Sequence, residues 1–212
     1  MEFLPQDIHD YAVHHTSSEP ELLKQLNAET HLKVLMPRML SGHLQGRFLA
    51  MIAHMIQPKY ILEIGTYTGY SALCMAEGLT KDGKIITIDK NDELASFAQK
   101  YFDQSVFKSQ IDYRIGLALD ILPELKETFD LVFIDADKVN YLNYFNLVIE
   151  KVRKGGFVIA DNVLWSGKVV DASKKDKNTQ AMKVFNRWIE EDNRVENVLL
   201  PIRDGLMMIR KK

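Results

Sequence analysis

The chain has 212 residues, of which 46% are hydrophobic and 26% charged, and its formal net charge is −2. This composition predicts a soluble globular protein with one large domain. A charge so close to zero argues against nucleic acid or an anionic membrane as the main partner. The start, "MEFLPQDIHDYAVHH", does not resemble a signal peptide, and no apolar run approaches the length of a membrane span. We therefore expect a cytoplasmic location.

Residues 1–40 are polar and show a helical pattern, so we expect them to form a helical N-terminal extension of one domain that covers residues 1–212. A further helix is expected in "GHLQGRFLAMIAHMI". From Tyr60 onward, short apolar runs alternate with helical segments. The expected strands cover 60–65, 84–89, 111–116, 130–135 and 156–161, and the helices between them cover 71–79, 92–102, 118–125 and 140–152.

Apolar runs that alternate with helices indicate a parallel sheet that is covered on both faces. At the end of the chain, "RVENVLLPI" and "GLMMIRKK" are joined only by "RDG". So short a link permits a hairpin and excludes a crossover, so the last strand should be antiparallel. We predict an α/β fold: a Rossmann-like, doubly wound sheet of about seven strands, mostly parallel, with an antiparallel C-terminal hairpin strand and N-terminal helices.

The single cysteine, Cys74, lies in the apolar run "SALCMAEGL". It cannot form an intramolecular disulfide, and its setting predicts a small buried hydrophobic residue rather than a nucleophile.

The first predicted strand runs into a glycine turn, "EIGTYTGYS", with Gly65 and Gly69. Tyr67 takes the place of the second glycine of G-x-G-x-x-G, which argues against a dinucleotide whose pyrophosphate approaches the backbone there. The second strand ends at Asp89, which can accept hydrogen bonds from both ribose hydroxyls or cap the following helix. The turn can equally be a plain strand–helix connection. Together the two features favour a nucleoside ligand without a pyrophosphate.

Two later strands also end on oxygen-bearing side chains: "DLVFID" ends at Asp135, and "FVIADN" ends at Asp161 and Asn162. If these strands are neighbours, three hard oxygen ligands converge, as Mg²⁺ prefers. Zinc is not expected, because Cys74 lies elsewhere and His43 is the only plausible nitrogen ligand. Each aspartate taken alone fits a helix cap better. As a pair at a nucleoside site, they favour a metal.

Five segments resemble the cation-dependent O-methyltransferases of the caffeoyl-CoA and catechol type: "ILEIGTYTGYSALCMA", "ITIDKND", "DLVFIDADKVNY", "GGFVIADNVLWSGKV" and "LPIRDGL". The resemblance runs from about Met36 to the C-terminus with the spacings kept. It implies S-adenosylmethionine as the nucleoside ligand and a homodimer. It also implies a divalent cation, usually magnesium with manganese or calcium as alternatives, that binds the vicinal hydroxyls of a small catechol-like substrate.

The resemblance implies a role for each matching residue. The implied cofactor-binding residues are Ser41, Glu63, Gly65, Tyr67, Ser71, Asp89, Ala118, Asp135 and Asp137. The implied metal ligands are Asp135, Asp161 and Asn162. Lys138 is the implied catalytic residue at the substrate, as general base or as a cation that stabilises the phenolate. We expect Trp165 either to form an aromatic wall of the substrate site or to pack against the loop below it.

Other interpretations stay open at this point. The polar stretch at 166–178 fits a mobile lid or a plain surface loop. The aromatic and arginine substrate contacts of the plant caffeoyl-CoA enzymes are missing from "NTQAMKVFNRW", which leaves free catechols, thioesters and flavonoids as acceptors. The rival functions are a metal-independent methyltransferase, a non-catalytic cofactor-binding module, and a dinucleotide oxidoreductase that Tyr67 disfavours.

Overall fold

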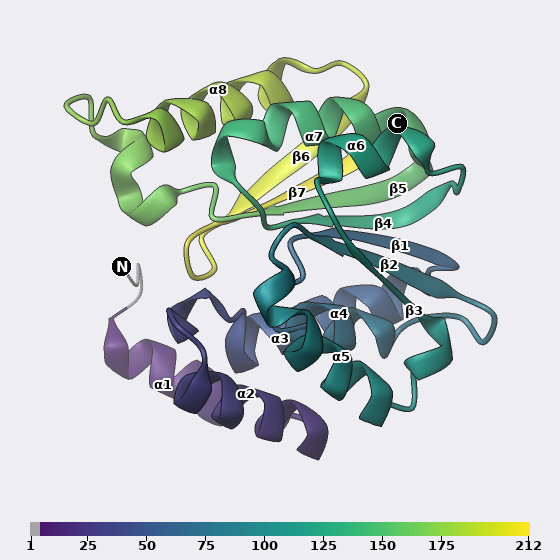
Figure 1. Cartoon of the computed structure of the whole chain (residues 1–212). Coiled ribbons are helices and arrows are strands. Elements are labelled where there is room, and N and C mark those ends of the chain that lie inside the picture. Colours follow the sequence, from purple (N-terminus) through teal and green to yellow (C-terminus); the bar gives the residue numbers. More distant parts are fainter. Residues whose placement is uncertain (1–4) are drawn as a thin grey trace.

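The computed structural model describes residues 5–212, and the first four residues of the predicted N-terminal extension lie outside this range. Within it, seven strands form one sheet in the order β3-β2-β1-β4-β5-β7-β6 (Figure 1). The strands are β1 (Tyr60–Ile64), β2 (Lys84–Asp89), β3 (Ile111–Ile115), β4 (Phe129–Ile134), β5 (Val152–Asp161), β6 (Val195–Leu200) and β7 (Leu206–Lys211). Only β7 runs antiparallel to the other six strands, which confirms the predicted α/β fold.

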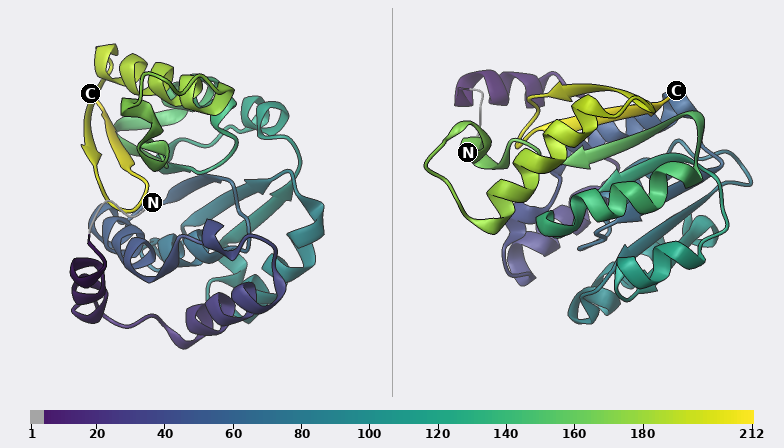
Figure 2. Two further views of the ribbon diagram at one scale, coloured as in Figure 1. Left: turned by 90° about the vertical axis from the view of Figure 1, so that its left-hand side faces the viewer. Right: turned by 90° about the horizontal axis from the view of Figure 1, so that it is seen from above.

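Helices cover both faces of the sheet and make three layers (Figures 1 and 2). The α-helices are α1 (Gln6–His14), α2 (Glu21–Lys33), α3 (Gly42–Ile56), α4 (Tyr70–Ala76), α5 (Ala95–Gln104), α6 (Ala118–Ile121), α7 (Tyr141–Val148) and α8 (Lys177–Glu191). Helices α2 to α5 share a buried apolar cluster with one face, and α6 to α8 share a second cluster with the other. No helix within residues 5–212 combines the length and apolarity that crossing a membrane requires.

The alternation of side chains along β1 shows why its sequence is almost continuously apolar. Ile61 packs in the cluster beneath α3 and α4, whereas Leu62 and Ile64 pack in the cluster beneath α7 and α8. A parallel strand that is buried on both faces needs apolar residues on both. The exception is Glu63, which is fully buried on the α3 side of the sheet.

Helix α8 was not predicted, because most of its residues are polar and a polar stretch precedes it. Met182, Phe185 and Ile189 are buried at helical spacing along its inner face. Asp176 caps its start by accepting a hydrogen bond from the Thr179 backbone N–H at 3.1 Å. The stretch at 166–178 overlaps η7 (Trp165–Val170), whose 3₁₀ geometry is interrupted by a kink at Ser166 and Gly167, where φ is +53° and +74°. Its mobility stays a prediction.

The order of strands reverses between β1 and β4, and the chain is tightest there. Gly65 follows β1 with φ of +104°, and a side chain at this position would place its Cβ 1.9 Å from the Asp135 carbonyl oxygen. Only glycine allows the two strand ends to approach so closely. Ligands of open α/β sheets bind at the carboxyl ends of the strands beside such a switch point.

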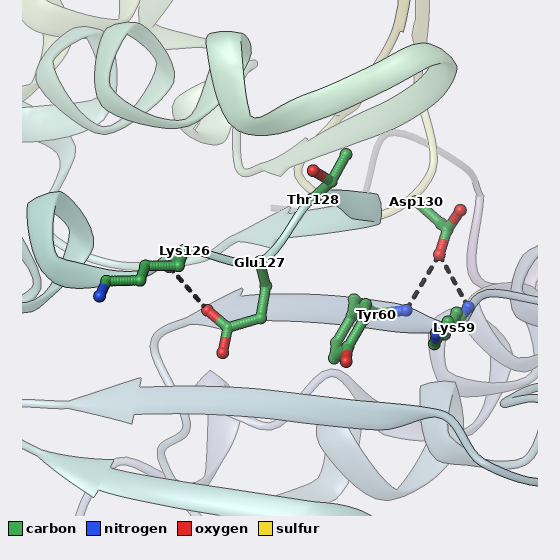
Figure 3. A pocket seen from close by; sticks show the side chains of 6 residues that line it. All are labelled: Lys59, Tyr60, Lys126, Glu127, Thr128 and Asp130. Carbon is green, nitrogen blue, oxygen red and sulfur yellow. Dashed lines mark hydrogen bonds between the residues drawn. The ribbon is translucent and has the colours of Figure 1, made fainter.

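A cavity of about 480 Å³ lies at the other end of the same two strands (Figure 3). Asp130 lines it and accepts hydrogen bonds from the backbone N–H groups of Lys59 and Tyr60, at 2.7 and 2.9 Å. These residues stand at the amino ends of β1 and β4, away from the strand ends at which polar residues were predicted. We therefore assign this cavity no part in the candidate site.

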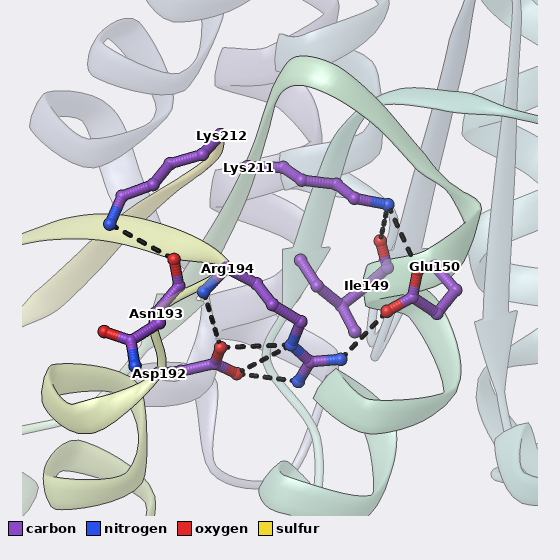
Figure 4. Close-up of polar contacts among 7 residues, drawn as sticks. All are labelled: Ile149, Glu150, Asp192, Asn193, Arg194, Lys211 and Lys212. Carbon is purple, nitrogen blue, oxygen red and sulfur yellow. Dashed lines mark hydrogen bonds and ion pairs between the residues drawn. The ribbon is translucent and has the colours of Figure 1, made fainter.

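A polar network holds the C-terminal hairpin in place (Figure 4). Arg194 donates to Asp192 at 2.6 Å and to Glu150 at 2.9 Å, while Lys211 donates to the Ile149 carbonyl at 2.8 Å. These contacts fix one end of the β6–β7 hairpin. The register places its turn, residues 201–205, at the other end, beside Asp161.

Candidate active site

The carboxyl ends of β4 and β5 are joined through two side chains that begin the segment after β4. Lys138 is 7% exposed, and its Nζ donates to Asp135 Oδ1 at 3.1 Å and to the Tyr141 hydroxyl at 2.6 Å. The Tyr141 hydroxyl donates in turn to the Asp161 carbonyl at 3.0 Å. The predicted catalytic lysine is thus a buried side chain held between the two predicted metal-binding strand ends.

Asp161 is 3% exposed, and both of its carboxylate oxygens accept hydrogen bonds. Oδ2 accepts from Gln45 Nε2 at 2.6 Å, and Oδ1 accepts from the Asn162 backbone N–H at 2.6 Å. Burial, followed by the charge of Asp135, raises the pKa of Asp161 above its ordinary value, while Lys138 acts in the opposite direction. The two aspartates are therefore close enough to repel each other.

The chain turns sharply after Asp161, and the hairpin turn holds it there. Asn162 has a left-handed φ of +58°, which asparagine tolerates better than most residues. The Leu164 N–H donates to the Asp204 carbonyl at 2.9 Å, and a Cβ at Gly205 would meet Leu164 at 2.6 Å. The tight "RDG" turn is what allows this approach.

Trp165 lies between the apolar core and two lysine side chains. Its ring packs against the apolar cluster beneath α7 and α8, yet Lys138 Nζ lies 5.7 Å from the ring centroid. Lys168 Nζ lies at the same distance. The indole N–H is buried without a hydrogen-bond partner among residues 5–212. Trp165 therefore packs against the core and also borders the lysine; contact with a substrate stays a prediction.

Glu63 lies in a small buried network of hydroxyl groups. Ser71 Oγ donates to one carboxylate oxygen and Thr87 Oγ1 to the other, both at 2.5 Å. Burial raises the pKa of Glu63 to about 8, against the lowering effect of these hydroxyls. The structure thus places two predicted cofactor residues, Glu63 and Ser71, in contact with each other.

Glu63→Gln should stabilise the protein increasingly as the pH rises. Unfolded glutamate loses its proton near pH 4.5 and the buried Glu63 near pH 8, so the folded state holds the extra proton between these values. The stability that the buried, protonated Glu63 contributes is therefore lost as the pH rises from about 4.5 to about 8. Urea unfolding at pH 6 and pH 9 should show a larger advantage of the variant at pH 9. A difference that does not change with pH would contradict the raised pKa.

Asp89 fixes the glycine turn to the end of β2. Its Oδ2 accepts from the Tyr67 N–H at 2.7 Å, and its Oδ1 accepts from the Asn91 N–H at 2.9 Å. The following 3₁₀ turn is capped by Asn91, which accepts from the Glu93 N–H at 3.0 Å. The alternative that Asp89 itself caps this helix is therefore wrong, while its role at a ribose stays a prediction.

The segment before α3 is tied to the hairpin turn. The Arg203 guanidinium donates to the Leu40 carbonyl at 2.8 Å and also to that of Ser41, which is buried. His43 Nε2 lies 2.7 Å from the Ser17 carbonyl oxygen, so its ring is bonded to the N-terminal region. The structure thus brings Ser41 to the same end of the sheet as Asp161.

Two further predicted cofactor residues, Asp137 and Ala118, lie in the segments that follow β4 and β3. Asp137 accepts hydrogen bonds from the Tyr144 hydroxyl at 2.6 Å and from Asn140 Nδ2 at 2.5 Å. Ala118 is 8% exposed and begins α6, directly after the end of β3.

The prediction for Cys74 is confirmed: it is fully buried, and burial raises the pKa of its thiol.

Among residues 5–212, no three His, Cys, Asp or Glu side chains are grouped in a way that would hold a metal ion. The predicted ligand set contains two aspartates and an asparagine, and asparagine is not one of those four residue types. Its assignment as a metal site therefore stays a proposal.

A family model described as O-methyltransferase matches residues 13–212. The chain belongs to this O-methyltransferase family. A catechol O-methyltransferase of Niastella koreensis is 40% identical over 160 residues, which are 74% of this chain and 72% of the relative. Caffeoyl-CoA O-methyltransferase 1 of Eucalyptus globulus is 38% identical over 205 residues, which are 91% of this chain and 82% of the relative.

A solved structure gives the same result for the fold of this O-methyltransferase. The SAH-bound methyltransferase PaMTH1 of Podospora anserina superposes with a TM-score of 0.90 at 28% identity, over 100% of this chain and 99% of that one. The predicted family and fold are thus confirmed. The protein is an S-adenosylmethionine-dependent O-methyltransferase, which removes the oxidoreductase and the non-catalytic module from the rival functions.

Three residues of the site were missed by the sequence analysis: Gln45, Tyr141 and Arg203. Tyr141 stands three positions after Lys138, the spacing of neighbours on a helical turn. Gln45 interrupts an otherwise apolar helix face that continues through Leu49 and Ala53. A polar residue on such a face was an available signal. The contacts of Arg203 have no comparable signal in the sequence, because its acceptors are backbone carbonyls about 160 residues earlier.

Proposed function

We propose that this O-methyltransferase transfers the methyl group of S-adenosylmethionine to one hydroxyl of a vicinal diol of the catechol type, and that it needs a divalent cation. One observation carries the proposal. Asp135 and Asp161 stand at the ends of neighbouring strands, close enough for the charge of one to raise the pKa of the other, beside the buried Lys138. The names of the catechol and caffeoyl-CoA relatives support the acceptor class.

The residues present fit a hard cation. Asp135, Asp161 and Asn162 offer only oxygen ligands suited to magnesium, manganese or calcium, and they leave coordination places for an acceptor. Two mutually repelling carboxylates, one of them buried, are stabilised by added positive charge. When bound, such an ion would hold both hydroxyls of the diol and favour ionisation of one of them.

Lys138 is placed to act on the reacting hydroxyl, either as a general base or as a cation that stabilises the phenolate. A phenol has a pKa near 10, so little of it is ionised at neutral pH. Nζ is held by Asp135 and Tyr141 in a largely buried position, which directs it to the strand ends rather than to bulk water. There it can accept the proton, or it can stabilise the phenolate as a cation.

Asp89→Ala tests the cofactor half of the site. If Asp89 accepts the ribose hydroxyls, removing this charged acceptor should weaken S-adenosylmethionine binding by about 1.5–3 kcal/mol, which is tenfold or more in Kd. Calorimetry measures that affinity, and metal affinity should stay nearly unchanged. The exposed neighbour Asp92→Ala is the matched control. An unchanged Kd in Asp89→Ala would limit Asp89 to holding the Tyr67 turn.

A methyl-transfer screen tests the proposed acceptor. Catechols, caffeate, caffeoyl-CoA and flavonoids should be compared with their mono-hydroxyl analogues, each with and without magnesium. Only acceptors with two adjacent hydroxyls should be methylated, because two oxygens are needed to chelate the ion. Equal rates on the mono-phenols would contradict the proposal.

The single domain with its extension at 1–40, the homodimer and the cytoplasmic location stay predictions. The same holds for the roles of the individual cofactor-binding residues.

A further inference from the structure

Gln45 is a buried amide at the candidate metal site. It lies in the first turns of α3, is 0% exposed, and donates from Nε2 to Asp161 Oδ2 at 2.6 Å. Its own oxygen, Oε1, is buried without a hydrogen-bond partner among residues 5–212. Buried polar atoms are nearly always paired, so an unpaired one calls for an explanation.

The direction of the amide follows from the charge of its partner. If the amide were turned over, Oε1 would face Oδ2, and two acceptor oxygens would repel each other. The arrangement therefore satisfies Asp161 and leaves the amide oxygen unpaired. Packing alone would be met by an apolar residue, as it is one and two turns later on the same face by Leu49 and Ala53. Departures from local packing rules are expected where a residue serves a site.

The helix that carries Gln45 is rigidly placed. The next residue, Gly46, lies so close to α4 that a Cβ there would be 2.6 Å from the Tyr70 ring and 2.9 Å from Cys74 Sγ. The backbone of α3 beside Gln45 is thus packed directly against α4. Its Nε2 and the Asn162 N–H hold the two oxygens of Asp161 from different sides.

We propose that Gln45 is a positioning residue of the metal site: it fixes the orientation of the Asp161 carboxylate so that this side chain is ready to bind a divalent cation. The inference rests on the proposed metal-dependent function. Residues that hold a metal ligand in place typically change metal affinity by 10–100-fold when they are removed.

Metal titration of two variants tests this role without the reaction. Gln45→Met removes the donor and keeps the length of the side chain, whereas Leu49→Met alters packing on the same buried face and keeps the hydrogen bond. Mn²⁺ affinity is measured by calorimetry, and S-adenosylmethionine affinity is measured on the same samples. We expect the Mn²⁺ Kd to rise about tenfold or more in Gln45→Met. Leu49→Met should match the wild type, and cofactor affinity should be unchanged in both.

Gln45→Asn, which retains the amide but is one methylene shorter, should also weaken Mn²⁺ binding, and it carries the test if Gln45→Met does not fold. An unchanged Mn²⁺ Kd in a folded Gln45 variant would overturn the inference and leave the metal proposal intact. A joint loss of metal and cofactor affinity would also overturn it, because Gln45 would then only support α3. Absence of Mn²⁺ binding by the wild type would refute the metal proposal itself and the inference with it.

Discussion

Asp161→Ala should abolish methyl transfer at ordinary magnesium concentrations. The substitution removes the buried carboxylate that we propose as a metal ligand, and even residues that only support a ligand change metal affinity by 10–100-fold, so we expect a rate loss of about 100-fold or more. S-adenosylmethionine binding, measured by calorimetry, should largely survive, because Glu63, Ser71 and Asp89 lie on other elements.

Asn162→Ala is the matched comparison. It removes a proposed ligand that is neutral and lies beside the same strand end, so excess magnesium should restore part of its activity, while Asp161→Ala should remain inactive. Wild-type activity in Asp161→Ala would show that this aspartate has a structural role only. Loss of cofactor binding in the same variant would show that the substitution had disturbed the fold rather than the metal.

Lys138→Met should lower kcat by about 10²–10⁴-fold, the usual contribution of a general acid or base. Methionine keeps the length of the side chain but removes the group that Asp135 and Tyr141 hold. Single-turnover methyl transfer measures this effect, with cofactor affinity unchanged. Lys168→Met is the control, because Lys168 lies as near to Trp165 as Lys138 does but has no hydrogen bond to Asp135 or Tyr141 among residues 5–212.

Lys138→Arg separates the two roles of Lys138. An arginine keeps the positive charge and cannot act as a base in a protein. Substantial activity in Lys138→Arg would assign stabilisation of the phenolate, and inactivity of both variants would favour proton transfer. Full activity of Lys138→Met would contradict both roles.

The fold could be predicted because the decisive signals are local. Apolar runs such as those ending at Ile64 and Ile134 alternate with helical segments, and the short "RDG" link leaves only a hairpin at the end. Helix α8 was missed although Met182, Phe185 and Ile189 carry its periodicity. This segment is polar overall because its outer face is exposed, and the regular apolar stripe on its inner face was overlooked.

The site was predictable where it follows strand ends. Asp89, Asp135 and Asp161 all stand at the carboxyl ends of parallel strands. The topology alone therefore places them at the same end of the sheet. The long-range partners did not follow from it. Gln45 reaches Asp161 across 116 residues, and Arg203 binds backbone carbonyls that no side-chain pattern marks. The predicted residues are the candidates for the chemistry, and the missed ones form hydrogen bonds to them or to their neighbouring backbone.

Methylation of a catechol by the wild-type protein in excess EDTA is the most direct measurement of the proposed metal dependence. We predict that chelation abolishes methyl transfer while S-adenosylmethionine still binds, and that added magnesium or manganese restores the rate. Full activity in EDTA would contradict the account. Asp135 and Asp161 would then be strand-end residues of a metal-independent methyltransferase.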